Sequence, residues 1–223
     1  MKYEIHSHTK ETSQCAKISA EELVNKYKEL GYSGIVITNH YSDLTFSLKE
    51  MFNKKLRTEH YLKGYREAKK YETDDFSVLL GIELRFFLNG NDYLIYGVTE
   101  DLVEKMPFLL PMYLKRTSKF FRKHGCIIIQ AHPYRPYIYR ANPKYLDGVE
   151  ILNGKSTKED NEKALKWAEK KNLKIRTAGS DCHRVTGAGL TGIIADEPIK
   201  TNDDLLRILK NGEFKVIEKN YKK

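Results

Sequence analysis

The chain has 223 residues, of which 40% are hydrophobic and 31% are charged. This length suits one large α/β domain or two small ones, and the composition excludes an intrinsically disordered chain. The formal net charge of +9 predicts an anionic partner, either a phosphorylated small molecule or a nucleic acid, with a solvated basic surface as the alternative. No apolar run approaches the ~18 residues of a membrane helix, so no membrane partner is expected.

The cysteines indicate a reducing environment. Cys15, Cys126 and Cys182 are odd in number and form no CxxC pair, and the first residues are too polar for a signal peptide. Because reduced thiols are typical of the cytosol, a cytoplasmic protein is expected.

Apolar patterning predicts the secondary-structure elements along the chain. A Ser-x-x-Glu capping box at Ser19 predicts the first helix, and short continuous apolar runs predict strands buried on both faces. Asn89-Gly90 between two apolar runs predicts a hairpin. Strands are expected at 1–5, 34–38, 76–82, 85–88, 93–98, 126–131, 148–152, 174–178, 190–195 and 214–217. Helices are expected at 19–30, 59–71, 111–125, 156–168 and 201–209, and residues 41–57 show no clear pattern.

This alternation of strands and helices predicts parallel strands in an α/β fold. About seven buried strands favour a closed (β/α) barrel over an open sheet, and we expect a single domain over residues 1–223. In such barrels the active site lies at the carboxyl ends of the strands.

Histidines and carboxylates recur where the apolar runs end. His6 and His8 are two residues apart, so in an extended chain their side chains point to the same side, and Asp181 and His183 repeat this spacing. The alternative is a set of core or capping histidines. The candidate metal ligands at strand ends are His6, His8, His40, Glu83, His132, Asp181 and His183.

This ligand set predicts the kind of metal centre. Imidazole mixed with carboxylate suits Zn, Mn or Fe better than Ca or Mg, which prefer oxygen. Seven ligands exceed the needs of one tetrahedral ion, so two or three divalent metal ions are expected. A cluster of this kind generates hydroxide at neutral pH and clamps the attacking and leaving oxygens of a phosphoryl transfer.

Five motifs in order resemble the polymerase and histidinol phosphatase (PHP) superfamily. They are His-Ser-His-Thr, Thr-Asn-His, Gly-Ile-Glu, Ala-His-Pro and Gly-Ser-Asp-Cys-His, and they span residues 6 to 183. The resemblance implies a distorted (β/α)7 TIM-like barrel with up to three metal ions. It implies one ion held by His6, His8, Glu83 and Asp181, a second shared by Glu83 and His132, and a third held by His40 and His183.

Three departures from the family pattern concern ligands. The family commonly has Asp where this chain has Asn39, for which a supporting or turn role is expected. The family often has a histidine after the Glu83 motif, and Asp92 is the best replacement here, with a turn residue as the alternative. The family usually has Asp or His in the loop after the first motif. Here Glu11 is the best candidate, with Gln14 and Cys15 behind it.

The residues around these motifs suggest how a phosphate substrate is held. Arg135, Arg140 and Arg184 closely follow ligand motifs, and arginine suits bidentate phosphate contact, so they are candidate catalytic residues. Arg135, Arg140, Asn153 and Tyr137 are candidate substrate-binding residues, Tyr137 by stacking on a ring. The alternatives are solvated arginines, a turn-capping Asn153 and a tyrosine packed on the barrel.

The sequence thus predicts a metal-dependent phosphoesterase in which metal-activated hydroxide attacks phosphorus and cations stabilise the developing charge. The expected substrate is a small phosphomonoester, either histidinol-phosphatase-like or a nucleotide. The alternatives are a nuclease or phosphodiesterase acting on nucleotides or short oligonucleotides, and a non-catalytic metal-binding module. The sequence indicates no oligomeric state.

Overall fold

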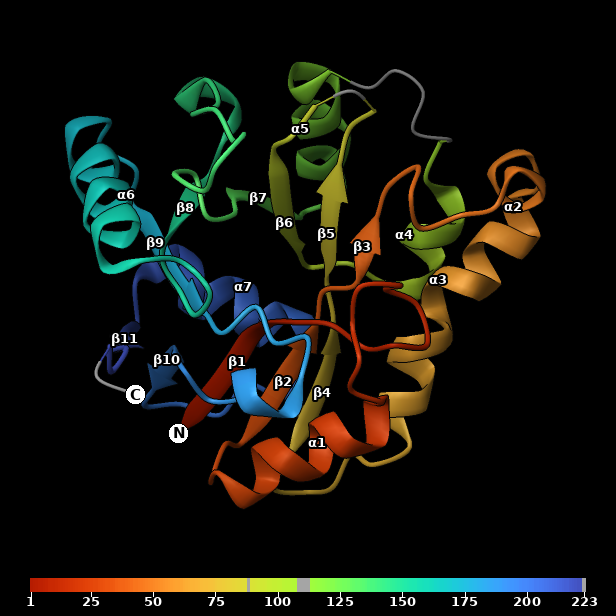
Figure 1. The fold of residues 1–223 in the computed structure, drawn as a ribbon, viewed down its shortest axis with the longest axis horizontal. Helices are drawn as coiled ribbons and strands as arrows, with labels where there is room; N and C mark the ends of the chain where they lie inside the picture. The colour runs from red at the N-terminus through yellow and green to blue at the C-terminus, as the bar shows by residue number, and fades with distance from the viewer. Residues whose placement is uncertain (88, 108–112, 222–223) are drawn as a thin grey trace.

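The strands form two sheets that share the centre of the molecule, with the helices outside them (Figure 1). The computed structural model describes residues 1–87, 89–107 and 113–221. The first sheet has the order β11-β10-β1-β2-β4, built from Phe214–Ile217, Gly192–Ala195, Lys2–Ser7, Gly34–Ile37 and Ser77–Leu80. The second has the order β3-β5-β6-β7-β8-β9, built from His40–Tyr41, Ile82–Arg85, Asp92–Tyr96, Ile127–Gln130, Gly148–Asn153 and Ile175–Gly179.

The two sheets make a distorted barrel because two strands are broken where they pass from one sheet to the other. β2 is followed after two residues by β3, and β4 is followed after Gly81 by β5. Counted as single broken strands, they give seven barrel strands: β1, β2/β3, β4/β5, β6, β7, β8 and β9. An isolated parallel bridge between Ser7 and Cys182 joins the end of β1 to the segment after β9. The expected seven-stranded barrel is confirmed, with the sheets meeting rather than forming one continuous ladder.

The pairing corrects the expectation of parallel strands throughout. β1-β2, β2-β4, β3-β5, β7-β8 and β8-β9 are parallel, whereas β5-β6, β6-β7, β1-β10 and β10-β11 are antiparallel. The predicted hairpin is present, but its first strand is β5 and not the expected run at 85–88, and Arg85 lies opposite Asp92. The hairpin reverses the chain, so β6 runs antiparallel to β5, and β6 is also antiparallel to β7. Glu83 lies inside β5 and not, as expected, at the end of the preceding strand.

The long helices other than the one at Leu114–Lys123 begin at residues whose side chains cap them. The capping box of Ser19 and Glu22 starts α1 (Ala20–Glu29), and Thr201 caps α7 (Asn202–Asn211). The others are α3 (Lys54–Lys69), α5 (Leu114–Lys123) and α6 (Lys158–Lys170). Residues 111 and 112 of the expected helix at 111–125 lie outside the described residues. Of two shorter helices, α2 (Leu48–Phe52) falls within residues 41–57, which showed no clear pattern, and α4 (Glu100–Lys105) falls where no helix was expected. A single turn or two gives little periodicity.

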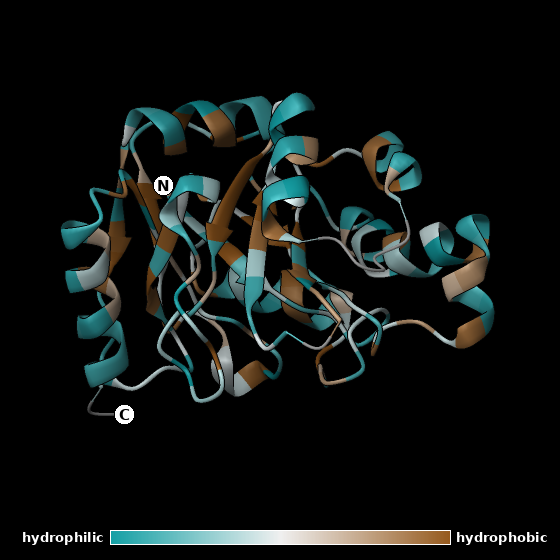
Figure 2. Cartoon of the chain, turned by 90° about the horizontal axis from the view of Figure 1, so that it is seen from above, coloured by the Kyte–Doolittle hydropathy of each residue, from teal (hydrophilic) through white to brown (hydrophobic). Residues whose placement is uncertain are grey.

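The apolar core lies between the strands and the helices. Figure 2 shows hydrophobic colour concentrated on the strands and hydrophilic colour on the outer helix faces. On one side Leu23 and Tyr27 of α1 pack with Ile35 and Val78 of the first sheet. Within the described ranges, no helix has the length and apolar character needed to cross a bilayer. The packing of the core holds the strand ends in place, and the strand ends carry the polar residues at the barrel rim.

Candidate metal centre

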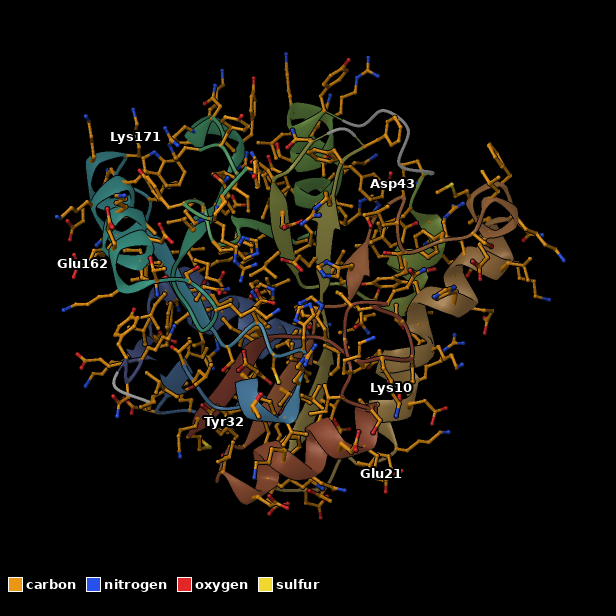
Figure 3. The ribbon with its side chains drawn as sticks, in the orientation of Figure 1. Lys10, Glu21, Tyr32, Asp43, Glu162 and Lys171 are labelled. Atoms are coloured by element: carbon orange, nitrogen blue, oxygen red, sulfur yellow. The ribbon has the colours of Figure 1, made fainter. Side chains whose placement is uncertain are left out.

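Glu83 is the centre of a buried cluster of imidazoles and carboxylates. Its Oε1 lies 3.2 Å from Nε2 of His6 and 3.1 Å from Nε2 of His132. Its Oε2 lies 2.8 Å from Nδ1 of His40 and 3.3 Å from Nε2 of His8. His6 and His8 come from β1 and the residues directly after it, whereas His40, Glu83 and His132 come from β3, β5 and the end of β7. Figure 3 shows the side chains on the ribbon, with the labelled Glu21, Glu162 and Lys171 at the periphery of the molecule.

Asp181 and His183 complete the cluster on the β9 side. Asp181 Oδ1 lies 3.4 Å from Nε2 of His8 and 3.2 Å from Nδ1 of His183. Four sets of side chains bring ligand atoms within 4.8 Å of one another: His6 with His8 and Asp181, His6 with Glu83 and His132, His8 with His40 and His183, and His40 with Glu83 and Asp92. All seven residues that the strand-end pattern selects are therefore brought together.

Two cluster residues have a backbone conformation that is uncommon for non-glycine residues. His132 follows β7 with φ of 28°, and Asp181 follows β9 with φ of 53°. Positive φ is sterically unfavourable for L-residues, and such strain is concentrated at functional sites. Here it lets the chain turn at the strand end while the side chain still reaches the cluster.

The cluster has the unsatisfied polar atoms that a bound cation would satisfy. Nε2 of His6, Nε2 of His8, Oε2 of Glu83 and Nδ1 of His132 are buried without a hydrogen-bond partner. Buried polar atoms are nearly always paired in proteins. All four residues belong to the groups that bring ligand atoms together, so the donor set fits divalent cations bound by nitrogen and oxygen.

Charge within the cluster keeps its carboxylates ionised. Burial alone would raise the pKa of Asp181, but the nearby His6, His183, His8 and Arg135 hold it well below its usual range. Glu83 is likewise buried, yet His40 and His6 hold its pKa well below the ordinary value. Both groups are therefore anionic at neutral pH and attract cations.

Asp92 and Glu11, the two candidates for metal ligands that the family pattern has and this chain lacks, lie in different places. Asp92 lies at the cluster, with Oδ2 3.7 Å from Nε2 of His132, and it also accepts two 2.6 Å hydrogen bonds from Arg85. Glu11 is not brought to the cluster. Its carboxylate accepts hydrogen bonds from the backbone N–H of Ala20, at 3.1 and 3.2 Å, and so satisfies a free donor at the start of α1.

Of the two roles expected for Asn39, its side-chain hydrogen bonds correspond to the supporting one. Its Oδ1 accepts from the Thr9 N–H at 2.8 Å and from the Ser13 hydroxyl at 2.9 Å, and its Nδ2 donates to the Thr9 hydroxyl. The Ser13 hydroxyl in turn accepts from the His40 N–H at 3.0 Å. Asn39 thereby fixes the loop after β1 beside the cluster.

Two cationic side chains contact Asp181. Arg135 donates to the carboxylate of Asp181 and, at 2.9 Å, to Oδ1 of the buried Asn153. Lys155, which the sequence analysis did not select, places its Nζ 3.2 Å from Oδ1 of Asp181 and 2.5 Å from Nδ1 of His183. The feature of the sequence that could have identified Lys155 is its position two residues after Asn153, at the end of strand β8. Positive charge is thus placed at the edge of the cluster.

The remaining substrate candidates lie farther out. Arg140 is exposed, with its guanidinium 5.2 Å above the Tyr134 ring. Arg184 is exposed at the start of the short helix Val185–Gly187. Among the described residues neither donates a hydrogen bond to the cluster. Tyr137 has 89% of its surface exposed.

Two supporting carboxylates were not selected by sequence. Glu150 of β8 lies with Oε1 2.8 Å from Nδ1 of His6, and its Oε2 accepts from the His132 N–H at 3.0 Å. Glu4 of β1 accepts from the His6 N–H at 2.8 Å. Both are charged residues within predicted buried strands, and this was the signal that could have identified them.

A small cavity adjoins the His40 side of the cluster. It measures about 250 Å³ and is lined by Gln14, Cys15, His40, Ser42, Leu44, Thr45 and Arg85. At its edge the Cys15 sulfur lies 3.1 Å from Nε2 of His183. Burial would raise the pKa of Cys15, but interactions with His183 and His40 outweigh burial and lower it to about 6.

Comparison with known families identifies the class of this fold and site. The model of the PHP domain matches residues 4–176, and a model described as PHP-associated matches residues 158–214. The chain belongs to the PHP domain family. It is therefore a metal-dependent hydrolase of the phosphoesterase class, as the motifs indicate. No curated protein matches the chain.

Solved structures with low sequence identity share the fold. PsfC from Pseudomonas syringae is 14% identical with a TM-score of 0.69, and the match covers 96% of this chain and 90% of that one. A two-domain protein from Bacteroides vulgatus, described as containing a predicted PHP-like metal-dependent phosphoesterase, is 14% identical (TM-score 0.62, 98% and 65% covered). The lesion-specific endonuclease EndoQ from Pyrococcus furiosus is 12% identical (TM-score 0.65, 96% and 57% covered).

Proposed function

We propose that this chain hydrolyses a small phosphomonoester at the cluster centred on Glu83. The observation that carries the proposal is the cavity of about 250 Å³ beside His40. Ligand pockets usually measure roughly 300–1,000 Å³, so this volume suits a small substrate group. A histidinol-phosphatase-like substrate or a nucleotide fits this class.

We assign the metal-binding role to the residues that the cluster brings together. They are His6, His8, His40, Glu83, Asp92, His132, Asp181 and His183. Two or three ions of Zn, Mn or Fe suit this mixture of imidazole and carboxylate. When bound, such ions supply an activated water and neutralise charge on phosphoryl oxygens.

The cationic side chains at the cluster edge orient the phosphate. Arg135 and Lys155 both contact Asp181, so either can present N–H groups to a phosphate oxygen bound beside that carboxylate. Asn153 holds the Arg135 guanidinium in place through its Oδ1. Fixed donors directed at developing charge stabilise a phosphoryl-transfer transition state. Arg140 and Arg184, exposed at the rim, are assigned to the outer part of the substrate.

The test is a substrate panel combined with elemental analysis. The purified protein is analysed for metal and assayed on p-nitrophenyl phosphate, bis(p-nitrophenyl) phosphate, mononucleotides and long single-stranded DNA, with added Mn²⁺, Zn²⁺ or Fe²⁺. We expect bound metal and fastest turnover of monoesters. His132→Ala and Asp181→Ala should lose metal and activity while retaining the fold. Full activity of both variants without metal would contradict the proposed centre.

A second candidate function is nuclease activity, which one specific observation favours. Tyr137 and Tyr139 have 89% and 72% of their surface exposed in the loop after His132, and exposed aromatics stack on bases with ~1–3 kcal/mol each. The fold similarity to the lesion-specific endonuclease and the charge of +9 are compatible with this reading.

Substrate length decides between the two candidates. For a nuclease, long strands would be cleaved faster than mononucleotides, with a steep salt dependence because many phosphates are contacted. For the monoesterase, Tyr137→Ala should weaken a nucleotide more than an alkyl phosphate. Tyr113→Ala is the matched control, because Tyr113 is also exposed but lies at the N-cap of α5, outside this loop.

We further propose a reducing, cytoplasmic location. The free thiols of Cys15, Cys126 and Cys182 support it. Thiol titration of protein denatured directly from anaerobic cell lysate should give three thiols per chain. A disulfide found in that sample would contradict this location.

A further inference from the structure

The loop after β1 is attached at two points to the residues that flank the outer edge of the cluster. The Ser13 hydroxyl accepts from the His40 N–H at 3.0 Å. Four residues later, the Lys17 N–H donates to the His183 carbonyl at 2.7 Å. Cys15 lies midway between these attachments, so the backbone holds it between His40 and His183.

The Cys15 side chain points toward the imidazoles. Its sulfur lies 3.1 Å from Nε2 of His183, and it also interacts with the His40 side chain. The thiol lines the cavity beside His40. The position is thus open to a small ligand while the sulfur stays within reach of both rings.

A second, independent observation points to a ligand at this edge. The ligand atoms of His8, His40 and His183 lie within 4.8 Å of one another, and the His8 and His183 ring centroids are 4.1 Å apart. Nε2 of the fully buried His8 has no hydrogen-bond partner. Three imidazoles this close, one of them unpaired, are better explained by a shared cation than by mutual hydrogen bonds.

Glu11, the other metal-ligand candidate in this loop with a charged side chain, already has hydrogen-bond partners elsewhere. The Glu11 carboxylate accepts hydrogen bonds from the Ala20 N–H at the start of α1. Gln14 offers a neutral amide and is exposed. Cys15 is therefore the loop residue that can add an anionic ligand to His40 and His183.

We propose that the Cys15 thiolate is a metal ligand, together with His40 and His183, at the outer edge of the cluster. The thiol proton leaves to solvent when the sulfur binds the ion, because thiolate is the ligand form. Sulfur selects zinc or iron over manganese, which prefers oxygen. This inference rests on the proposed metal centre and assigns one edge of it a soft ligand in place of a carboxylate.

Cobalt substitution tests the assignment by a spectroscopic signal that does not depend on turnover. The full-length protein is stripped with a chelator under reducing, anaerobic conditions and titrated with Co²⁺. We expect visible ligand-field bands from cobalt bound in the centre. A near-ultraviolet sulfur-to-cobalt charge-transfer band should appear with the cobalt equivalent that fills the outer-edge site of Cys15, His40 and His183. Cys15→Ser should remove the charge-transfer band, and the buried Cys126→Ser, whose sulfur contacts the Gly97 carbonyl, should keep it.

Cys15→Asp separates the ligand role from a packing role. A carboxylate at this position should restore the bound metal equivalent that Cys15→Ser loses, without the sulfur band, and should shift preference in Zn²⁺/Mn²⁺ competition toward Mn²⁺. Ligand-field bands without a sulfur band in the wild-type protein would overturn the Cys15 assignment and leave the metal centre standing. The absence of any cobalt bands would overturn the metal centre itself.

Discussion

Nδ1 of His6 lies 2.8 Å from Oε1 of Glu150, and both side chains are fully buried. This contact orients the His6 ring so that its other nitrogen, Nε2, faces Glu83 and Asp181. A carboxylate that holds a ligating histidine by its second nitrogen fixes the ring orientation and raises its basicity. Glu150 is therefore a positioning residue for the cluster.

Glu150→Gln should weaken metal binding while the fold is retained. The amide keeps the shape but loses the charge that supports His6, and changes of this kind typically cost ~10–100-fold in metal affinity. Titration against a chromophoric chelator measures this loss. The surface variant Glu162→Gln on α6 serves as the control, and equal affinities for the two variants would remove the positioning role from Glu150.

Asp92→Ala and Glu11→Ala should behave differently although the sequence treats them alike. Asp92 lies at the cluster beside His132, so its removal should lower the metal-to-protein ratio measured by elemental analysis. Glu11 accepts from the Ala20 N–H, so its removal should leave that ratio unchanged and reduce stability by about 0.5–2 kcal/mol, as for a lost helix cap. The reverse pattern in elemental analysis and chemical denaturation would contradict both assignments.

Gly64→Ala should disturb the loop beside the cluster through α3. A Cβ at Gly64 would lie 2.1 Å from the Thr9 hydroxyl and 2.6 Å from Nδ2 of Asn39. Overpacking of this kind typically costs about 1–3 kcal/mol, and here the displaced groups are those that hold the loop near His8. Urea denaturation measures the stability, and Lys63→Ala on the exposed face of the same helix is the control. An unchanged urea midpoint for Gly64→Ala would contradict this prediction, because the loop would then accommodate the added methyl group without loss of stability.

Arg135→Ala should reduce kcat/KM for a phosphomonoester more than it changes stability. Its guanidinium contacts Asp181 at the cluster and is held by Asn153, and loss of one such fixed donor typically costs about 10²–10³ in kcat. Steady-state kinetics on p-nitrophenyl phosphate measures the effect. Arg207→Ala, which breaks surface pairs with Glu197 and Glu213, is the matched control. If the two arginine variants were equally active, Arg135 would have no role in phosphate binding.

The sequence by itself predicted the barrel and selected the seven cluster residues, although Glu83 lies inside β5 and not at a strand end. Each residue follows or ends an apolar run, and the strand period of two places His6 and His8 on one side of the chain. Because strands of a barrel carry their carboxyl ends to one rim, residues at those ends meet there whatever the details of the loops. Local patterning and one general rule of the fold were therefore sufficient for His6, His40, His132 and Asp181.

Only the tertiary structure decided which other residues join the cluster. Glu11 and Cys15 are four residues apart in one polar loop, and the path of that loop directs the carboxylate to Ala20 and the sulfur to His183. Glu150 meets His6 across a separation of 144 residues. No local pattern encodes such contacts, because they depend on how the loops and strands pack in space. The sequence thus determines which residues lie at the strand ends and so at the rim. The packing of loops and neighbouring strands determines which further residues reach the rim.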